Sequence, residues 1–226
     1  MHPFMNMIVI AGLTAALLSP TRFKETTAVS SDARPYTAPV TVQPSVAQLA
    51  GTDSLLLYFD ETTKALEAQV QGLTEAQLQF KPAPDKWSIS QCLEHIILSE
   101  GMLFGMAKTE LAKAPQPEKR NEVKVSDTDL KSMLTKRSQK FQAPKELQPS
   151  GKYTDVQKAL ADFRTARQPI LDFIKQADAE DLRNHITEYP TGTVDGYQGL
   201  MFIAAHGARH TKQIEEIKAS PNFPKK

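Results

Sequence analysis

The sequence predicts an all-α protein, a four-helix bundle with short auxiliary helices. Apolar residues recur at three- and four-residue spacing in four long segments, which is the period of one face of an α-helix. The alternating pattern of a strand appears nowhere over a useful length, and we find no internal repeat. Hydrophobic residues make up 40% of the chain, which is enough for such helices to enclose a packed core.

The first fifty residues are typical of a leader and a linker. Residues 5–19 are apolar yet too short for a membrane span, so residues 1–30 are predicted to be a signal peptide or, alternatively, an uncleaved N-terminal anchor. Residues 31–51 are rich in Thr, Ala, Ser, Val and Pro, which predicts a disordered tether. The bundle therefore occupies residues 52–220, with no membrane span expected beyond the N-terminal segment. We expect the protein to be exported, to the periplasm or another extracytoplasmic location.

The first long helix is predicted to begin at Thr52 or Asp53, since either residue can cap it, and to end at Gly72. Its apolar face is built from Leu55, Leu56, Phe59, Leu66 and Val70. Prolines interrupt the next segment, which is expected to be a connector with one short helical turn at residues 74–78.

The second long helix is expected to open at Ser88 or Ser90 and to run to about Lys113. It is apolar nearly all round, and a helix of that kind lies in the centre of a fold. His95 therefore faces the interior. Taken alone, an inward histidine is more often a hydrogen-bonded core residue than a metal ligand.

Two helical segments follow between proline-containing loops. Residues 126–137 are predicted to form a short helix capped by Ser126. Residues 154–177 are predicted to form the third long helix, in which Pro169 is expected to introduce a kink. Residues 179–193 are then expected to be a long irregular connection.

The last long helix carries a pair of histidines. It begins after Asp195, the predicted N-cap, with Gln198 in the position that reaches back to the cap. His206 and His210 are four residues apart, which places them about 40° apart around the helix axis and one turn above the other. This spacing is typical of a divalent metal site on one helix, although two hydrogen-bonded core histidines fit the pattern equally well. The pair lacks the glutamate of the metalloprotease motif HExxH.

Two segments resemble the DinB-like superfamily. Residues 85–100, DKWSISQCLEHIILSE, show its Trp-Ser, His and Glu pattern, and residues 191–217, TGTVDGYQGLMFIAAHGARHTKQIEEI, are similar to its last-helix signature HxxRHxxQI. The resemblance implies a four-helix bundle with up-down-down-up connectivity. It also implies a divalent metal ion bound by three histidines, which fall on His95, His206 and His210 of this sequence.

Three neutral imidazoles leave at least one coordination position open, which is the layout of a catalytic metal site. The expected cofactor is one divalent ion, and the ligands suit Zn, Ni, Fe or Mn. An ion held in this way can activate bound water or a thiol, and several relatives are thiol-dependent transferases or isomerases. The expected function is therefore a metal-dependent enzyme of the hydrolase or thiol-dependent transferase type. The thiol-using relatives are cytoplasmic, whereas this chain is expected to be exported. The alternative is a non-catalytic metal-bound module for binding or stress response.

The charge composition bears on the partners. The chain has 27 Lys and Arg against 26 Asp and Glu and contains no long basic run, which excludes nucleic acid as a partner. The expected partner is a small-molecule substrate that the sequence does not identify, and a homodimer is left open as the assembly. The single cysteine excludes an intramolecular disulfide.

Three other side chains lie near the expected ligands along the chain. Gln213 shares the His206 stripe, where it would orient a ligand or bound water or be a core amide. Cys92 precedes His95 by about one turn and is favoured as a packing residue over a fourth ligand. Trp87 is expected to close one end of the bundle or to form a pocket wall.

Four polar residues complete the candidates. Glu94 and Glu100 point away from the His95 stripe and are predicted to be solvated or in salt bridges. His185 and Tyr189 lie on the connection into the last helix, where they would overhang the site as acid or base or simply be exposed. No residue stands out as the catalytic base.

Overall fold

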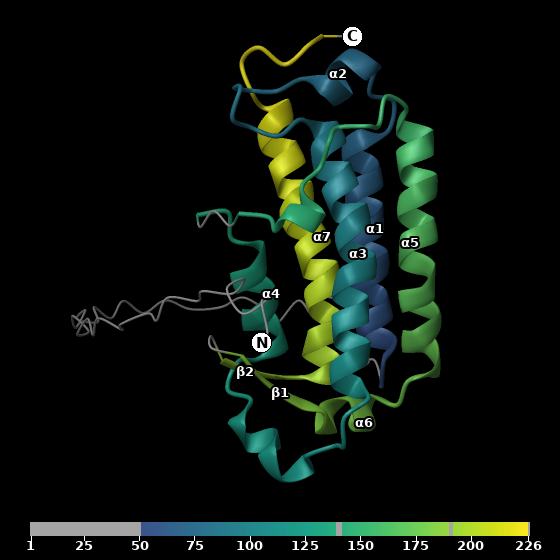
Figure 1. Ribbon diagram of the computed structural model, residues 1–226, viewed down its shortest axis with the longest axis vertical. Coiled ribbons are helices and arrows are strands. Elements are labelled where there is room, and N and C mark those ends of the chain that lie inside the picture. Colours follow the sequence, from purple (N-terminus) through teal and green to yellow (C-terminus); the bar gives the residue numbers. More distant parts are fainter. Residues whose placement is uncertain (1–50, 139–141, 190–191, 226) are drawn as a thin grey trace, which may run out of the picture.

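A computed structural model describes residues 51–138, 142–189 and 192–225 (Figure 1). The leader predicted at residues 1–30 and the tether before Gly51 lie outside the described residues. Among the described helices, none combines the length and the apolar character needed to cross a membrane.

The bundle consists of four long helices, α1 (Asp53–Val70), α3 (Ile89–Leu111), α5 (Val156–Gln176) and α7 (Gly196–Lys218). α1 and α7 run from the lower to the upper end of Figure 1, whereas α3 and α5 both run downward. α1 and α3 each pack against both α5 and α7. The connectivity is up-down-down-up, which confirms the predicted fold class, and Pro169 does not end α5.

Because α3 and α5 run in the same direction, the chain must return along the length of the bundle between them. This return contains the 3₁₀-helix η1 (Pro117–Glu122), α4 (Asp127–Thr135) and the 3₁₀-helix η2 (Lys145–Leu147). α4 packs against α7. The helix predicted at residues 126–137 is therefore present, and it ends at Thr135.

Short elements lie at the two ends of the bundle. α2 (Glu75–Gln79) is at the upper end, whereas α6 (Ala179–Asn184) and an antiparallel hairpin of β1 (Ile186–Tyr189) and β2 (Gly192–Asp195) are at the lower end. The paired residues of the hairpin are Ile186–Asp195, Thr187–Val194, Glu188–Thr193 and Tyr189–Gly192. The predictions of no strand and of an irregular connection here were wrong, because strands of four residues are too short to produce a recognisable alternation.

Local hydrogen bonds determine where the histidine-bearing helices begin. At α3, Ser88 Oγ accepts from the Gln91 N–H at 3.2 Å and the Ser88 N–H donates to Gln91 Oε1 at 3.0 Å, a complete capping box. At α7, Asp195 accepts from the Gln198 N–H at 2.8 Å, which confirms the predicted cap. The Gln198 amide does not reach back, however, because it donates to Val125 O at 2.8 Å.

Gly196 allows α7 to start close to α3 and α6. A Cβ atom at this position would overlap the Leu111 side chain and lie 2.8 Å from Leu182 O, so no larger residue fits. This close approach fixes the position of α7 along α3, and with it the relative heights of His206 and His95.

The core consists of an upper and a lower apolar cluster with a polar layer between them. In this layer Arg167 of α5 and Glu100 of α3 form an ion pair, Nη2–Oε1 2.5 Å, and both side chains are 2% exposed. Arg167 also donates to Phe59 O and Thr62 Oγ1 of α1, at 3.2 and 3.1 Å. A Cβ atom on Gly207 of α7 would lie 3.3 Å from the same guanidinium. The pair thus connects all four long helices.

Candidate metal centre

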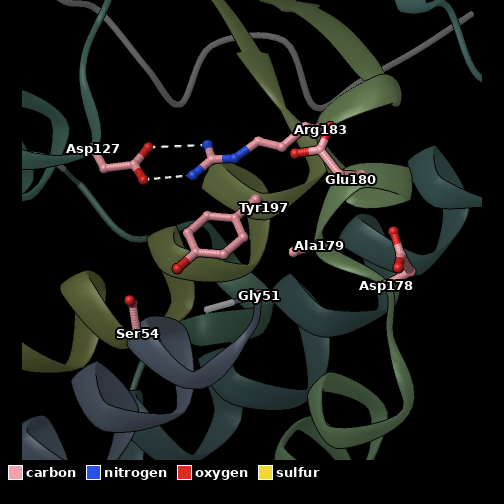
Figure 2. A pocket seen from close by; sticks show the side chains of 8 residues that line it. All are labelled: Gly51, Ser54, Asp127, Asp178, Ala179, Glu180, Arg183 and Tyr197. Atoms are coloured by element: carbon pink, nitrogen blue, oxygen red, sulfur yellow. Dashed lines mark hydrogen bonds and ion pairs between the residues drawn. The ribbon is translucent and has the colours of Figure 1, made fainter. Parts of the chain in front are cut away.

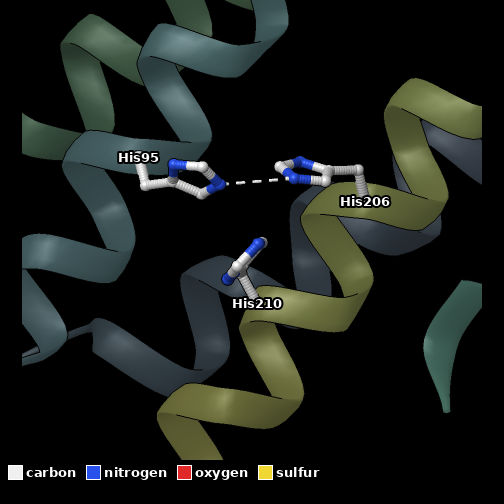
Figure 3. A group of neighbouring side chains, drawn as sticks. All are labelled: His95, His206 and His210. Atoms are coloured by element: carbon white, nitrogen blue, oxygen red, sulfur yellow. Dashed lines mark hydrogen bonds between the residues drawn. The ribbon is translucent and has the colours of Figure 1, made fainter. Parts of the chain in front are cut away.

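The three histidines predicted as ligands lie together (Figure 3): His95 on α3 faces His206 and His210 on α7. One ring nitrogen of each lies within 4.8 Å of those of the other two. The ring centroids are 5.1 Å apart for His95–His206, 4.5 Å for His95–His210 and 4.6 Å for His206–His210. Within the described residues, this is the one group of three or more His, Cys, Asp or Glu side chains close enough to hold a metal ion.

Hydrogen bonds behind two of the rings determine which nitrogen carries the proton. His95 Nδ1 lies 2.8 Å from the Leu147 carbonyl oxygen, and His210 Nδ1 lies 3.0 Å from Gln213 Oε1. Since carbonyl oxygens only accept, both Nδ1 atoms are protonated and both Nε2 atoms carry lone pairs. Metal-binding histidines are oriented by contacts of this kind. Gln213 therefore contacts the ring of His210, as expected if it orients a ligand.

The donor set fits a divalent ion. His95 Nε2 and His206 Nε2 are 3.3 Å apart, and two nitrogens bound tetrahedrally to one zinc at about 2.0–2.1 Å would lie about 3.3–3.4 Å apart. The His206 ring can donate one N–H toward this centre, whereas His95 and His210 both present lone pairs. An unpaired lone pair is costly in a buried site, so the arrangement favours a cation at its centre.

The surroundings keep the imidazoles neutral. His95 and His210 are buried and His206 is partly exposed. Burial, followed by the proximity of His95 and Arg209, lowers the pKa of His206 to about 3. Burial also lowers the pKa of His95, and burial together with the other two imidazoles lowers the pKa of His210 well below its usual value. The neutral imidazole is the form that binds metals.

Two aromatic rings flank the cluster. The Trp87 ring centroid lies 4.8 Å from that of His95 and 5.9 Å from that of His210. Phe202, one turn before His206, lies 6.3 Å from its ring with an angle of 20° between the planes. Both aromatic side chains are partly buried. Trp87 is therefore a wall of the histidine cluster as well as part of the upper core.

Cys92 belongs to the upper apolar cluster and is fully buried. Burial raises the pKa of its thiol, which favours the protonated form. It lies outside the histidine cluster, in agreement with the favoured packing role.

The two glutamates differ from each other. Glu100 pairs with Arg167, as the salt-bridge alternative predicted. Glu94 is buried and accepts hydrogen bonds from Gly151 N at 2.7 Å and Ser150 Oγ at 3.0 Å, so the prediction of a solvated or salt-bridged side chain was wrong for it. Burial raises the pKa of Glu94, but hydrogen bonds from the backbone and from Ser150 outweigh that effect and lower it.

His185 and Tyr189 lie at the lower end of the bundle. His185 is buried, its Cβ lies 3.5 Å from where a Cβ on Gly196 would be, and its Nε2 lies 3.5 Å from Asp181 Oδ2. Gly196 precedes His206 by ten residues, which is about 15 Å of helix. Both alternatives predicted for His185, an overhanging acid or base and an exposed residue, were therefore wrong. Tyr189 ends β1 in the adjacent hairpin.

A separate cavity of about 420 Å³ lies at the lower end (Figure 2). Arg183 beside it is held by Asp127 at 2.6 Å and Asp195 at 2.8 Å, and its guanidinium lies 3.8 Å from the Tyr197 ring centroid. The two carboxylates outweigh the effect of burial and raise the pKa of Arg183. The lining of this cavity includes none of the three clustered histidines, so it is separate from the histidine cluster.

The Leu147 carbonyl is the contact of this centre that the sequence does not predict. It belongs to the last part of the return, between α4 and α5, and is more than fifty residues from His95 along the chain. A backbone oxygen leaves no signal in a side-chain pattern, so the sequence offered no means to find it.

Comparison with known proteins places the chain in a family. The sequence model of the DinB superfamily matches residues 58–214. The uncharacterized protein YuaE of Bacillus subtilis (strain 168) is 23% identical over 160 residues, which cover 71% of this chain and 94% of YuaE. The solved structure of YfiT from Bacillus subtilis, described as a probable metal-dependent hydrolase with an unusual four-helix bundle topology, covers 85% of this chain and 95% of YfiT with a TM-score of 0.52.

At 13% sequence identity, the likeness to YfiT establishes the shared fold. The match to the superfamily model establishes family membership, because residues 58–214 make up more than half of the chain and include all three clustered histidines. The protein belongs to the DinB superfamily.

Proposed function

We propose that this protein binds one divalent metal ion through His95, His206 and His210 and is a metal-dependent hydrolase acting on a small molecule. The observation that carries the proposal is the convergence of the three rings, with the Nδ1–H groups of His95 and His210 directed away from the centre. Zn, Ni, Fe and Mn are all compatible with imidazole ligands. The description of YfiT as a probable metal-dependent hydrolase supports the hydrolytic alternative.

The open coordination favours catalysis over a structural role. Structural zinc sites are closed by four protein ligands, whereas three histidines leave a position free. When bound, a divalent ion supplies Lewis acidity, which polarises a carbonyl or phosphoryl oxygen and activates water near neutral pH. The partial exposure of His206 leaves a side from which a small molecule can approach.

The protein's own groups prepare this chemistry. Leu147 O and Gln213 hold two rings in the tautomer with a free Nε2. The Trp87 and Phe202 rings lie against the imidazole rings and cover part of the cluster. Because the imidazoles are neutral, they do not reduce the charge of a bound cation, which strengthens its attraction for anionic groups that develop on a substrate.

The first experiment measures metal content and affinity. Protein purified without an affinity tag should contain about one divalent ion per chain. His95→Ala, His206→Ala and His210→Ala should each reduce Zn²⁺ affinity sharply while circular dichroism remains that of a helical protein. His185→Ala is the matched control, since this histidine is buried but lies outside the cluster. Parental affinity in all three cluster variants would contradict the proposal.

The second experiment measures turnover. The metal-loaded protein is assayed with ester, amide and phosphoester substrates, each with and without a low-molecular-weight thiol. Metal-dependent hydrolysis without thiol is the expected result. Activity that requires thiol would instead indicate a transferase, and metal binding without turnover would indicate a non-catalytic binding or stress-response module.

We also propose that the protein is exported. The apolar run at residues 5–19 and the tether that follows it support this localisation. The mature protein should begin near Ser31 and be recovered outside the cytoplasm. N-terminal sequencing that found Met1 on a soluble cytoplasmic protein would contradict export, whereas Met1 on a membrane-bound protein would indicate an uncleaved anchor.

A further inference from the structure

The return between α3 and α5 passes close to the histidine cluster before it enters α5. We name residues 144–153 the return loop. It contains η2, and its Leu147 carbonyl accepts from His95 Nδ1 at 2.8 Å. The same topology that makes α3 and α5 run in parallel therefore brings this backbone oxygen behind a histidine of the centre.

The return loop is attached to the first half of α3 by side chains of that helix. Ser90 Oγ accepts from the Tyr153 N–H at 2.9 Å, and Gln91 Nε2 donates to Pro149 O at 3.4 Å. These contacts lie on either side of the segment that Glu94 binds.

Glu94 makes the densest set of contacts to the return loop. Its carboxylate accepts from the Gly151 N–H at 2.7 Å, the Lys152 N–H at 3.2 Å and Ser150 Oγ at 3.0 Å. The side chain is buried, with 6% of its residue surface exposed. Charged acceptors form stronger hydrogen bonds than neutral ones, so this carboxylate is the principal attachment of the loop to α3.

Gly151 allows the loop to take this path. Its φ is +86°, a conformation that residues with a side chain rarely adopt. A Cβ atom there would also lie 3.2 Å from Gln91 Cγ. The close approach of the backbone is what brings the Gly151 N–H within reach of the Glu94 carboxylate.

We propose that Glu94 is a positioning residue for the metal centre, because it fixes the return loop whose Leu147 carbonyl determines the tautomer and ring orientation of His95. Glu94 and His95 are adjacent in sequence and project about 100° apart around α3, so Glu94 acts through the loop and not by direct contact. The inference rests on the proposed metal site for its functional meaning. Its structural part, the control of the His95 tautomer, is measurable in metal-free protein.

The test compares Glu94→Gln with Glu100→Gln. Both glutamates are buried on α3, but within the described residues the Glu100 carboxylate pairs with Arg167 of α5 and not with the return loop. In Glu94→Gln the Zn²⁺ dissociation constant should rise about 10–100-fold, the usual effect of losing a group that supports a metal ligand. In metal-free Glu94→Gln, ¹H–¹⁵N NMR of the imidazoles should show that His95 has lost its fixed Nδ1–H tautomer.

Ser150→Ala provides a second, milder variant in case Glu94→Gln does not fold. It removes one of the hydrogen bonds to the Glu94 carboxylate. It should therefore raise the Zn²⁺ dissociation constant less than Glu94→Gln does and leave His95 with a smaller loss of its fixed tautomer. Unchanged Zn²⁺ affinity and an unchanged His95 tautomer in a folded Glu94 or Ser150 variant would overturn the inference. An equal loss of affinity in Glu100→Gln would also overturn it, since the effect would then follow from general stability. If the parent protein binds none of Zn²⁺, Ni²⁺, Fe²⁺ and Mn²⁺, the proposed function fails, and the tautomer measurement alone decides the role of Glu94.

Discussion

His210 Nδ1 and Gln213 Oε1 lie 3.0 Å apart, on neighbouring turns of α7. The amide oxygen fixes the proton on Nδ1 and leaves the Nε2 lone pair of His210 directed at the other two histidines. One helix thus supplies two imidazoles and the group that orients one of them.

Gln213→Leu removes the acceptor and keeps a side chain of similar size. The Zn²⁺ affinity should fall about 10–100-fold, because the His210 ring is no longer held in its binding orientation. Competition with a chromogenic chelator measures the dissociation constant. Lys212→Ala, at the exposed neighbouring position, is the control. An affinity equal to the parent's would mean that Gln213 is only a core amide.

The metal-free protein should lose stability as the pH falls below about 6.5, the usual histidine pKa. Burial lowers the pKa of His206 to about 3 and also lowers those of His95 and His210, so the unfolded chain binds more protons in this range. Each such proton changes the free energy of unfolding by about 1.4 kcal/mol per pH unit. Above about pH 6.5 both states are neutral, and these histidines contribute no further slope.

Urea denaturation in the presence of a chelator, on either side of that pH, measures this dependence. His206→Ala should reduce the slope at acidic pH by roughly one proton. Identical slopes in the parent and the variant would show that His206 is not the low-pKa group. In the metal-bound protein, acid should also release the ion, because a metal binds only deprotonated imidazole.

Glu100→Gln should reduce the free energy of unfolding by about 3–5 kcal/mol, because it leaves the Arg167 guanidinium buried without its counter-charge. Glu67→Gln is the matched control: Glu67 pairs with Arg164 at a more exposed position, where the loss should be about 0–1 kcal/mol. Urea denaturation compares the two. Similar losses in both variants would contradict the importance assigned to the buried pair.

Cys92→Ala should leave the metal content unchanged and reduce the free energy of unfolding by about 1 kcal/mol, a typical value for a point substitution. The reason is that Cys92 is buried among apolar side chains and lies outside the histidine cluster. Metal analysis and urea denaturation of one preparation test both parts. A clear loss of bound metal would make Cys92 a ligand.

The local part of the fold could be predicted from the sequence. Helix caps such as Ser88 and Asp195 act over three residues, and the apolar period that defines each long helix repeats within every turn. For the same reason His206 and His210 could be assigned to one face of one helix. The hairpin at residues 186–195 could not be predicted, because its strands are too short to establish a period.

His185 and Glu94 show where local reasoning ends. His185 is buried against the start of α7, and Glu94 is buried against a loop more than fifty residues further along the chain. The burial of these two side chains is not determined by the residues next to them in sequence. Each depends on which segment packs over the side chain.

The sequence alone determined four long helices, the family resemblance and the inward-facing positions of the three histidines on their helices, because all of these depend on residue type and on spacing within a few turns. Only the tertiary structure decided that His95 meets His206 at 3.3 Å and that Leu147 O lies behind it. These contacts depend on the relative heights of α3 and α7 and on the course of the return loop. The positions of the two helices along the bundle and the path of the loop follow from packing between distant segments, such as the close approach at Gly196. No local sequence pattern encodes this packing.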